Sequence, residues 1–219
     1  MHNIVQNLVD IQNKINAHLE EHKIDKVPKI IAVSKTFKIE KILPLIDHGH
    51  KHFGENKVQE AVDKWTEIKL SNPNIQLHLI GKLQTNKVKF ALKIFDYIHS
   101  VDSEKLAKKI SDEQIKINKK IKIFIQVNIG QEDQKSGTSV NELSSLISYC
   151  NKINLDVVGL MCIPPINEDP VSYFEKMKKL NEENKFNELS MGMSSDYLKA
   201  AMNNATYLRI GSSIFGQRY

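Results

Sequence analysis

The sequence predicts an α/β protein whose parallel strands close into a (β/α)₈ barrel of the TIM type, with one extra helix at the N-terminus. Eight short apolar runs recur along the 219 residues, and segments of helical period lie between them. The strongest runs, "IKIFIQVNI" and "DVVGLMCI", lack polar alternation, which is typical of parallel strands covered on both faces. Eight such strand–helix repeats favour a closed barrel. An open doubly wound sheet is the alternative, but no GxGxxG pattern follows the first strand.

The first predicted elements are an N-terminal helix and the strands that follow it. Within "MHNIVQNLVDIQNKINAHLEEH", apolar residues recur at helical intervals, at Ile4, Leu8, Ile11, Ile15 and Leu19. Polar residues separate them, so this segment is predicted to dock on the barrel and not to be a signal peptide. The eight predicted strands are Ile30–Ser34, His50–Phe53, Leu77–Ile80, Tyr97–His99, Ile121–Asn128, Val157–Met161, Glu188–Met191 and Tyr207–Ile210.

Three segments between the strands have the clearest helical period: "IEKILPLIDHG", "EKLAKKISDEQIK" and "NELSSLISYCNKI". Their predicted buried faces consist of Ile39, Ile42, Leu43 and Ile46, then Leu106, Ile110 and Ile115, then Leu143, Leu146, Ile147 and Ile153. Ser139 followed by Glu142 fits a capping box, which indicates a helix start in front of the third segment.

The composition is that of an ordinary globular protein, with 41% apolar and 26% charged residues. The net charge of +5 comes from dispersed lysines without a dense basic tract, so nucleic-acid binding has weak support. The two cysteines form no CxxC pair, which fits a reducing cytosol. No stretch is long enough to span a membrane. We therefore expect a cytoplasmic protein with a single domain over residues 1–219, and a monomer, because no long apolar surface stripe is left over.

Candidate site residues lie directly after the predicted strands, where active sites of such barrels are found. Lys35 follows the first strand, and "GEN" with Asn56 follows the second. The loops after the seventh and eighth strands read "GMSSD" and "GSSIFGQR". Each loop opens a predicted helix, whose exposed N–H groups favour an anion. The serines are ordinary N-caps when either loop is taken alone, but both loops together favour a phosphate.

The amine of Lys35 is predicted to lie beside this phosphate, because the barrel closes the eighth strand onto the first. Partial burial lowers the pKa of an amine and leaves more of it neutral, as Schiff-base formation needs. The same position suits a simple ionic contact with the phosphate, and spacing leaves both roles open.

Other polar residues of the strands are predicted to have structural roles. His78 and His99 are interpreted as hydrogen-bonded core histidines, since no HxH or HExxH spacing supports a metal site. Cys162 is predicted to be buried, and Met193 to pack in the barrel. Glu55 and Asn56 are each assigned equally to pocket lining or to local capping.

The chain resembles the pyridoxal phosphate homeostasis proteins, single-domain relatives of the alanine racemase N-terminal barrel. The similar stretches are "AVSKT", "FGENKVQE", "HLIGKLQTNK", "VNIGQEDQKSG", "GLMCIPP", "LSMGMSSDYLKAAM" and "RIGSSIFGQR". They cover nearly the whole chain in order; Leu79 departs from a frequent phenylalanine. The resemblance implies that Lys35 forms the internal aldimine with pyridoxal 5'-phosphate (PLP). It also implies cofactor-binding roles for Asn56, Ser194, Ser195, Arg209, Gly211 and Ser212, with the phosphate on the serines and Gly211 and with Arg209 at the ring nitrogen or the phosphate.

The family resemblance implies a PLP carrier without catalysis of its own, with PLP-dependent apoenzymes as recipients. A racemase or decarboxylase is the first alternative. Alanine racemases that resemble this barrel need a second domain and a catalytic tyrosine, whereas the sequence ends at Tyr219 after the last barrel motif, and only Lys35 is evident as a base. The second alternative is a Schiff-base aldolase acting on a phosphosugar, although such aldolases usually carry the lysine on a later strand.

Overall fold

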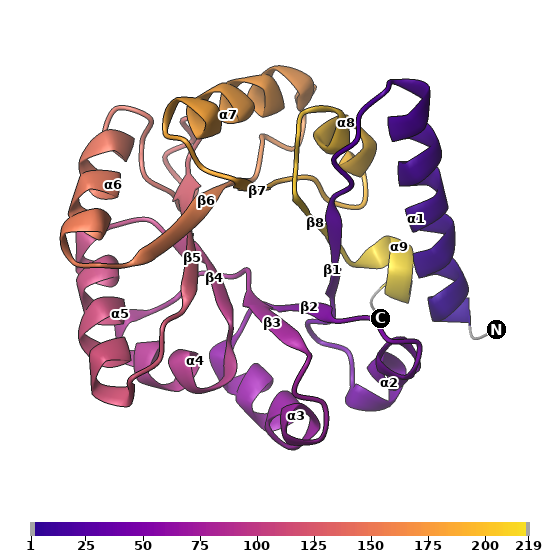
Figure 1. Cartoon of the computed structure of the whole chain (residues 1–219), viewed down its shortest axis with the longest axis horizontal. Helices are drawn as coiled ribbons and strands as arrows, with labels where there is room; N and C mark the ends of the chain where they lie inside the picture. Colours follow the sequence, from indigo (N-terminus) through magenta and orange to yellow (C-terminus); the bar gives the residue numbers. More distant parts are fainter. Residues whose placement is uncertain (1–2, 218–219) are drawn as a thin grey trace.

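A closed barrel of eight parallel strands forms the centre of the molecule (Figure 1). The structure is a computed structural model that describes residues 3–217. The strands are β1 (Lys29–Val33), β2 (His52–Glu55), β3 (Gln76–Leu79), β4 (Tyr97–Val101), β5 (Lys122–Val127), β6 (Asp156–Cys162), β7 (Glu188–Ser190) and β8 (Tyr207–Ile210). Neighbours in the barrel are neighbours in the chain, and β8 closes the ring by pairing with β1 from Lys29↔Tyr207 to Ala32↔Ile210. The predicted barrel is confirmed, and the open sheet is excluded.

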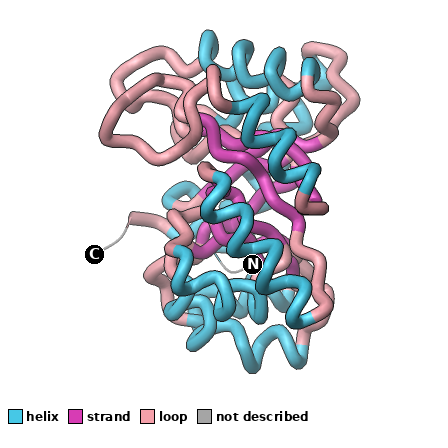
Figure 2. The backbone as a smooth tube through the Cα atoms, turned by 90° about the vertical axis from the view of Figure 1, so that its left-hand side faces the viewer, coloured by secondary structure: helices cyan, strands magenta, loops and turns pink. Residues whose placement is uncertain are grey.

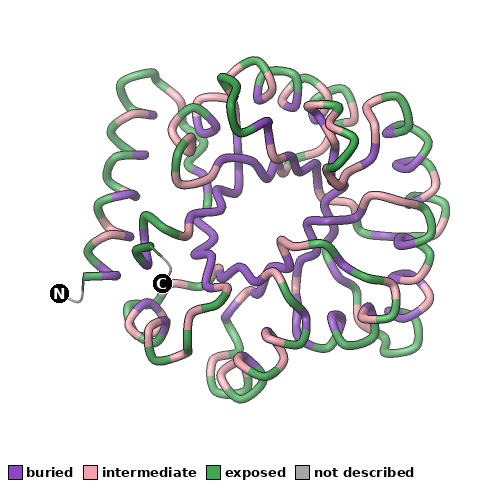
Figure 3. Tube along the Cα trace, turned by 180° about the vertical axis from the view of Figure 1, so that it is seen from behind, coloured by how far each residue is buried: buried purple, intermediate pink, exposed green. Residues whose placement is uncertain are grey.

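The helices lie outside the barrel and cover it all round. They are α1 (Asn3–Glu21), α2 (Ile39–Asp47), α3 (Val58–Ser71), the 3₁₀ turn η1 (Thr85–Lys87), α4 (Val88–Ile94), α5 (Glu104–Ile117), α6 (Leu143–Lys152), α7 (Val171–Glu183), α8 (Tyr197–Met202) and α9 (Ser212–Phe215). Figure 2 shows the strands running through the middle with helices on either side. Figure 3 shows the ring of strands buried and the outward faces of the helices exposed. The strands thus have both faces covered, which explains their continuous apolar runs.

The N-terminal helix α1 is an additional cover over the last part of the barrel. Its residues Ile15 and Leu19 are completely buried or nearly so, and the helix packs against α9, α8 and α2. The Asn7 side chain donates to the Ile214 carbonyl oxygen at 2.9 Å, which joins α1 to α9. Among residues 3–217, no helix has the length and apolarity needed to cross a bilayer.

Some predicted details of the elements are wrong. Leu43 and Ile115 were expected on buried helix faces but are exposed, because Leu45 in α2 and Gln114 in α5 take the buried positions beside them. The Ser139–Glu142 bonds form, at 2.8 Å between the side chains and 3.2 Å from the Glu142 N–H, yet they close a turn and α6 starts afterwards at Leu143. Strand ends differ from prediction by up to two residues, because a parallel strand ends where its neighbour stops pairing and not where apolar residues stop.

The inside of the barrel is packed with aromatic rings and imidazoles as well as aliphatic side chains. Its buried apolar side chains form a cluster separate from the core between strands and helices, and they are Ile31, Tyr97, Phe124, Met161 and Tyr207. Imidazoles from β2, β3 and β4 lie among these rings. At the β6–β7 contact, by contrast, space is so tight that a Cβ on Gly159 would lie 1.8 Å from the Glu188 carbonyl oxygen. Only glycine fits there.

Candidate functional site

A cavity of about 600 Å³ opens at the carboxyl ends of the strands and is lined by all seven predicted site residues. These are Lys35, Asn56, Ser194, Ser195, Arg209, Gly211 and Ser212. They come from the ends of β1, β2, β7 and β8, far apart in the chain, and the closed barrel brings them together. The volume lies in the range of small-molecule sites. Their roles in cofactor binding remain predictions.

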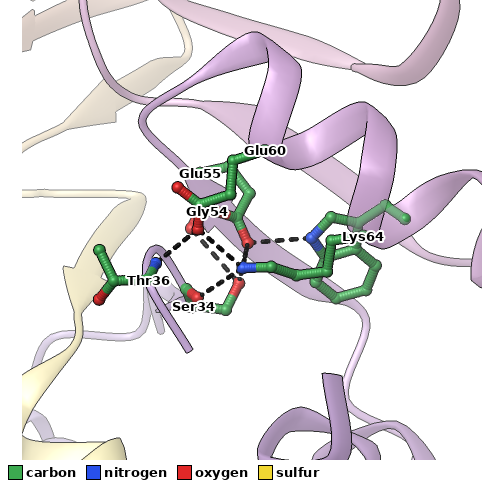
Figure 4. Close-up of polar contacts among 7 residues, drawn as sticks. Ser34, Thr36, Gly54, Glu55, Glu60 and Lys64 are labelled. Carbon is green, nitrogen blue, oxygen red and sulfur yellow. Dashed lines mark hydrogen bonds and ion pairs between the residues drawn. The ribbon is translucent and has the colours of Figure 1, made fainter. Parts of the chain in front are cut away.

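The backbone on both sides of Lys35 is held by α3 (Figure 4). The Lys64 ammonium donates to the Ser34 carbonyl oxygen at 3.0 Å, and the Thr36 N–H donates to Glu60 Oε1 at 2.5 Å. Lys64 and Glu60 are themselves paired at 3.0 Å. Thr36 has a φ of 68°, a left-handed conformation that a β-branched residue rarely adopts. The position of Lys35 at the cavity is therefore set by bonds to its neighbours.

A buried carboxylate lies beneath this turn. Glu55 Oε1 accepts from the Ser34 hydroxyl at 2.8 Å, the Trp65 indole at 2.9 Å and Lys64 at 3.0 Å (Figure 4). Burial raises the pKa of Glu55 above its usual value, and Lys64 opposes that rise. Glu55 is completely buried and has neither of the roles considered from the sequence, pocket lining or local capping. It holds the turn that carries Lys35 and does not line the cavity.

The loops after β7 and β8 are joined to each other at the cavity. Ser194 Oγ accepts from the N–H groups of Gly211 and Ser213, both at 3.4 Å. The N–H groups of Ser195 and Ser212 donate to no acceptor within residues 3–217. A shared serine and unsatisfied backbone donors are the groups from which protein sites for phosphate are built.

Arg209 brings a positive charge to the cavity wall. It is 5% exposed and donates from Nη1 to Ser190 Oγ at 2.7 Å and from Nη2 to the Cys162 carbonyl oxygen at 2.8 Å. Among the described residues no carboxylate forms an ion pair with it, and Asp196 acts only at longer range. Burial lowers the pKa of Arg209, so its surroundings oppose the charge rather than neutralise it.

Several lining residues were not predicted. Val33, Ile80 and Ile163 form apolar parts of the wall, and Met193, expected to pack in the barrel, lines the cavity instead. Cys162 is buried as predicted, and burial raises its pKa to about 12. Short apolar residues at strand ends carry no signal that separates lining from packing, which explains why sequence reasoning missed them.

The cavity extends toward the end of β5. A second hollow of about 270 Å³ shares Asn56, Ile80 and Ile163 with the first and adds polar side chains, among them Lys82 and Lys135. The combination of a lysine amine, a buried guanidinium, hydroxyls and backbone donors suits a small anionic ligand that carries a carbonyl group.

Comparison with known proteins supports these observations. The model of the family described as alanine racemase, N-terminal domain, matches residues 7–219. The pyridoxal phosphate homeostasis protein of Pasteurella multocida is 35% identical over 98% of this chain and 97% of its own length. That of Aquifex aeolicus is 38% identical over 87% of each chain.

Solved structures show the same fold. PipY of Synechococcus elongatus, known without PLP and with PLP bound, has 32% identity and a TM-score of 0.80, covering 92% of this chain and 100% of PipY. An alanine racemase of Clostridium difficile has a TM-score of 0.76 over 57% of its chain, but its 16% identity supports the fold alone. The chain therefore belongs to the alanine racemase N-terminal domain family, and within it to the pyridoxal phosphate homeostasis proteins.

Proposed function

We propose that this chain binds PLP, holds it as a reversible Schiff base on Lys35 and takes part in intracellular PLP homeostasis. The observation that carries the proposal is that one cavity gathers all seven residues selected from the sequence. The names of the relatives and the PLP-bound structure of PipY support the choice of ligand. PLP carries an aldehyde, with which a lysine amine can react, and a phosphate, which hydroxyl and backbone N–H donors can bind.

The groups at the cavity fit both ends of this ligand. The Lys35 amine would hold the aldehyde carbon, and Ser194, Ser195, Gly211 and Ser212 would bind the phosphate through hydroxyl and backbone donors. Gly211 lies against Val33, with a Cβ position 3.4 Å from the Val33 backbone oxygen, so the loop after β8 packs against the end of the strand that leads to Lys35. Asn56 and Arg209 complete the wall, where Arg209 would donate to the ring nitrogen or the phosphate.

We propose a carrier rather than an enzyme. Racemisation needs an acid and a base on opposite faces of the ligand. Among the described residues that line the cavity, Lys35 is the one that offers an amine as a base, since Arg209 stays protonated. The relatives are named for homeostasis, in agreement with this choice.

The remaining features of the proposal concern the whole chain. We propose that residues 1–219 act as one PLP-binding domain, that the protein is a cytoplasmic monomer, and that PLP-dependent apoenzymes receive the cofactor. Light scattering after size-exclusion chromatography tests the monomer, for which we expect a mass near 25.1 kDa. Mixing the loaded chain with an apoenzyme across a dialysis membrane and in direct contact tests whether handover needs contact.

The test of the ligand is an absorption spectrum of the purified chain, followed by borohydride reduction and peptide mass mapping. We expect a visible band and a pyridoxyl-phosphate mass on Lys35. Lys35→Ala should lose both and keep its circular dichroism, whereas Lys57→Ala, an exposed lysine beside Asn56, should keep them. A wild-type chain that stays colourless and unmodified with added PLP would refute the proposal. Lysine-dependent turnover of an amino acid would refute the carrier role.

A further inference from the structure

A continuous chain of hydrogen bonds crosses the inside of the barrel and ends at Arg209. His52 Nδ1 lies 3.0 Å from His78 Nε2, and His78 Nδ1 lies 2.9 Å from His99 Nε2. His99 Nδ1 lies 2.9 Å from Ser190 Oγ, which accepts from Arg209 Nη1 at 2.7 Å. These five residues come from β2, β3, β4, β7 and β8. We call them the imidazole chain.

The rings of this chain are fixed by stacking. His78 is stacked on Tyr97, with ring centroids 4.3 Å apart and 15° between the planes. His99 is stacked on Phe124 at 4.3 Å and 22°. Both imidazoles are completely buried. Their planes are therefore set by packing, and each ring presents one nitrogen to each neighbour along the chain.

Both central histidines are uncharged. Burial lowers the pKa of His78 and of His99 well below 6.5, and Arg209 lowers that of His99 further, while the two neighbouring rings oppose each other's protonation. A neutral imidazole has one N–H donor and one acceptor nitrogen. Each ring can therefore donate in one direction along the chain and must accept from the other.

The direction follows from Arg209. A guanidinium only donates, so Ser190 Oγ is the acceptor of that bond. The Ser190 hydroxyl proton then has one acceptor among the described residues, His99 Nδ1. His99 must carry its proton on Nε2 and donate to His78, which donates in turn to His52. The opposite direction would bury the Ser190 proton without an acceptor, which is unfavourable.

This direction stabilises a cation that lacks a counter-ion. Every acceptor atom of the chain, the Ser190 oxygen and the Nδ1 atoms of His99, His78 and His52 behind it, faces toward Arg209. Burial of a charge without a partner is unfavourable, and oriented dipoles offset part of that cost. A carboxylate at Ser190 would also stabilise the guanidinium but would cancel its charge. The hydroxyl and the imidazoles leave the charge available at the cavity wall.

We propose that Ser190, His99 and His78 are positioning residues that hold Arg209 in place as an uncompensated cation for the ligand. The ligand side of this proposal rests on the proposed function, with PLP as the ligand. The direction of the bonds does not, because it is a property of the ligand-free chain.

The first test measures the histidine tautomers in the ligand-free, ¹⁵N-labelled chain by long-range ¹H–¹⁵N correlation at pH 7, with signals assigned from single His→Gln variants. We expect His78 and His99 to be neutral with the proton on Nε2. In Ser190→Ala, His99 loses its hydroxyl donor, and its tautomer should become mixed. A proton on Nδ1 of His99 in the wild-type chain, or a charged ring, would overturn the proposal.

The second test measures PLP affinity by absorbance titration. We expect Ser190→Ala to weaken binding about tenfold or more, as for loss of a hydrogen bond to a charged group, and Ser190→Thr, which keeps the hydroxyl, to restore it. Equal affinity of Ser190→Ala and wild type would overturn the positioning role. If the wild-type chain binds no PLP, the proposed function fails and the ligand role of Arg209 fails with it, whereas the tautomers still decide the direction of the bonds.

Discussion

Replacing Lys64 with methionine tests whether α3 fixes the turn that carries Lys35. The Lys64 ammonium makes three contacts at 3.0 Å, to the Ser34 carbonyl oxygen and to Glu55 and Glu60. Its side chain is 9% exposed and that of Glu55 is fully buried. Methionine keeps most of the aliphatic length but removes the charge, so that the change acts on the ion pairs more than on packing.

The expected cost follows from the carboxylate left behind. Removing one partner of a buried ion pair costs about 3–5 kcal/mol, because the other charge stays buried. At low pH the cost is smaller, since Glu55 then becomes neutral. Burial already raises the pKa of Glu55 above 4.5, and loss of Lys64 raises it further. A carboxyl group whose pKa is higher in the folded chain than in the unfolded chain destabilises the fold as pH rises above the unfolded value of 4.5, so the destabilisation of Lys64→Met should grow as pH rises above 4.5.

Urea unfolding measured by tryptophan fluorescence is the assay. Trp65 is the single tryptophan and donates to Glu55, so its emission reports on this site. The matched control is Lys108→Met, which breaks an exposed ion pair with Asp112 on α5 and should cost less than about 0.5 kcal/mol. Schiff-base formation at Lys35 should also slow in Lys64→Met. Similar losses of stability in both variants, or a loss that does not change with pH, would refute the reasoning.

Three further predictions concern the barrel itself. Burial lowers the pKa of His50 to about 4 in the folded chain. Between pH 6.5 and pH 4 this histidine is therefore protonated in the unfolded chain and neutral in the folded chain. The free energy of unfolding should consequently fall by up to about 3 kcal/mol from pH 6.5 to pH 4. His50→Gln should reduce that slope in urea titrations, and an unchanged slope would contradict it. Gly159→Ala should cost about 3 kcal/mol or more or prevent folding, because the new methyl group meets the Glu188 backbone; thermal melting near the wild-type midpoint would show that the strands can separate there. Both cysteines are buried, and burial raises the pKa of each to about 12, so Ellman's reagent should label Cys150 and Cys162 only in denaturant.

The parts of the fold that could be predicted depend on local patterns. The strands and Lys35 follow from apolar runs and from the rule that barrel sites lie at carboxyl ends, whereas the role of Arg209 came from the family resemblance. The partners of buried polar groups could not be predicted. Glu55 meets Lys64 across the β2–α3 connection, and Ser190 meets His99 across the barrel, because closure brings β4 and β7 face to face. No sequence spacing encodes such contacts.

Closure of the ring has a consequence for the order of events during synthesis. The β1–β8 pairing joins residues almost the length of the chain apart, from Lys29↔Tyr207 to Ala32↔Ile210. Contacts of such long sequence separation form late, since the loop entropy must be overcome first. Lys35 leaves the ribosome early, whereas Arg209 and Gly211 follow only with β8. The cavity around Lys35 therefore cannot be complete before β8 has been synthesised, so we expect the proposed loading of Lys35 only after translation of β8.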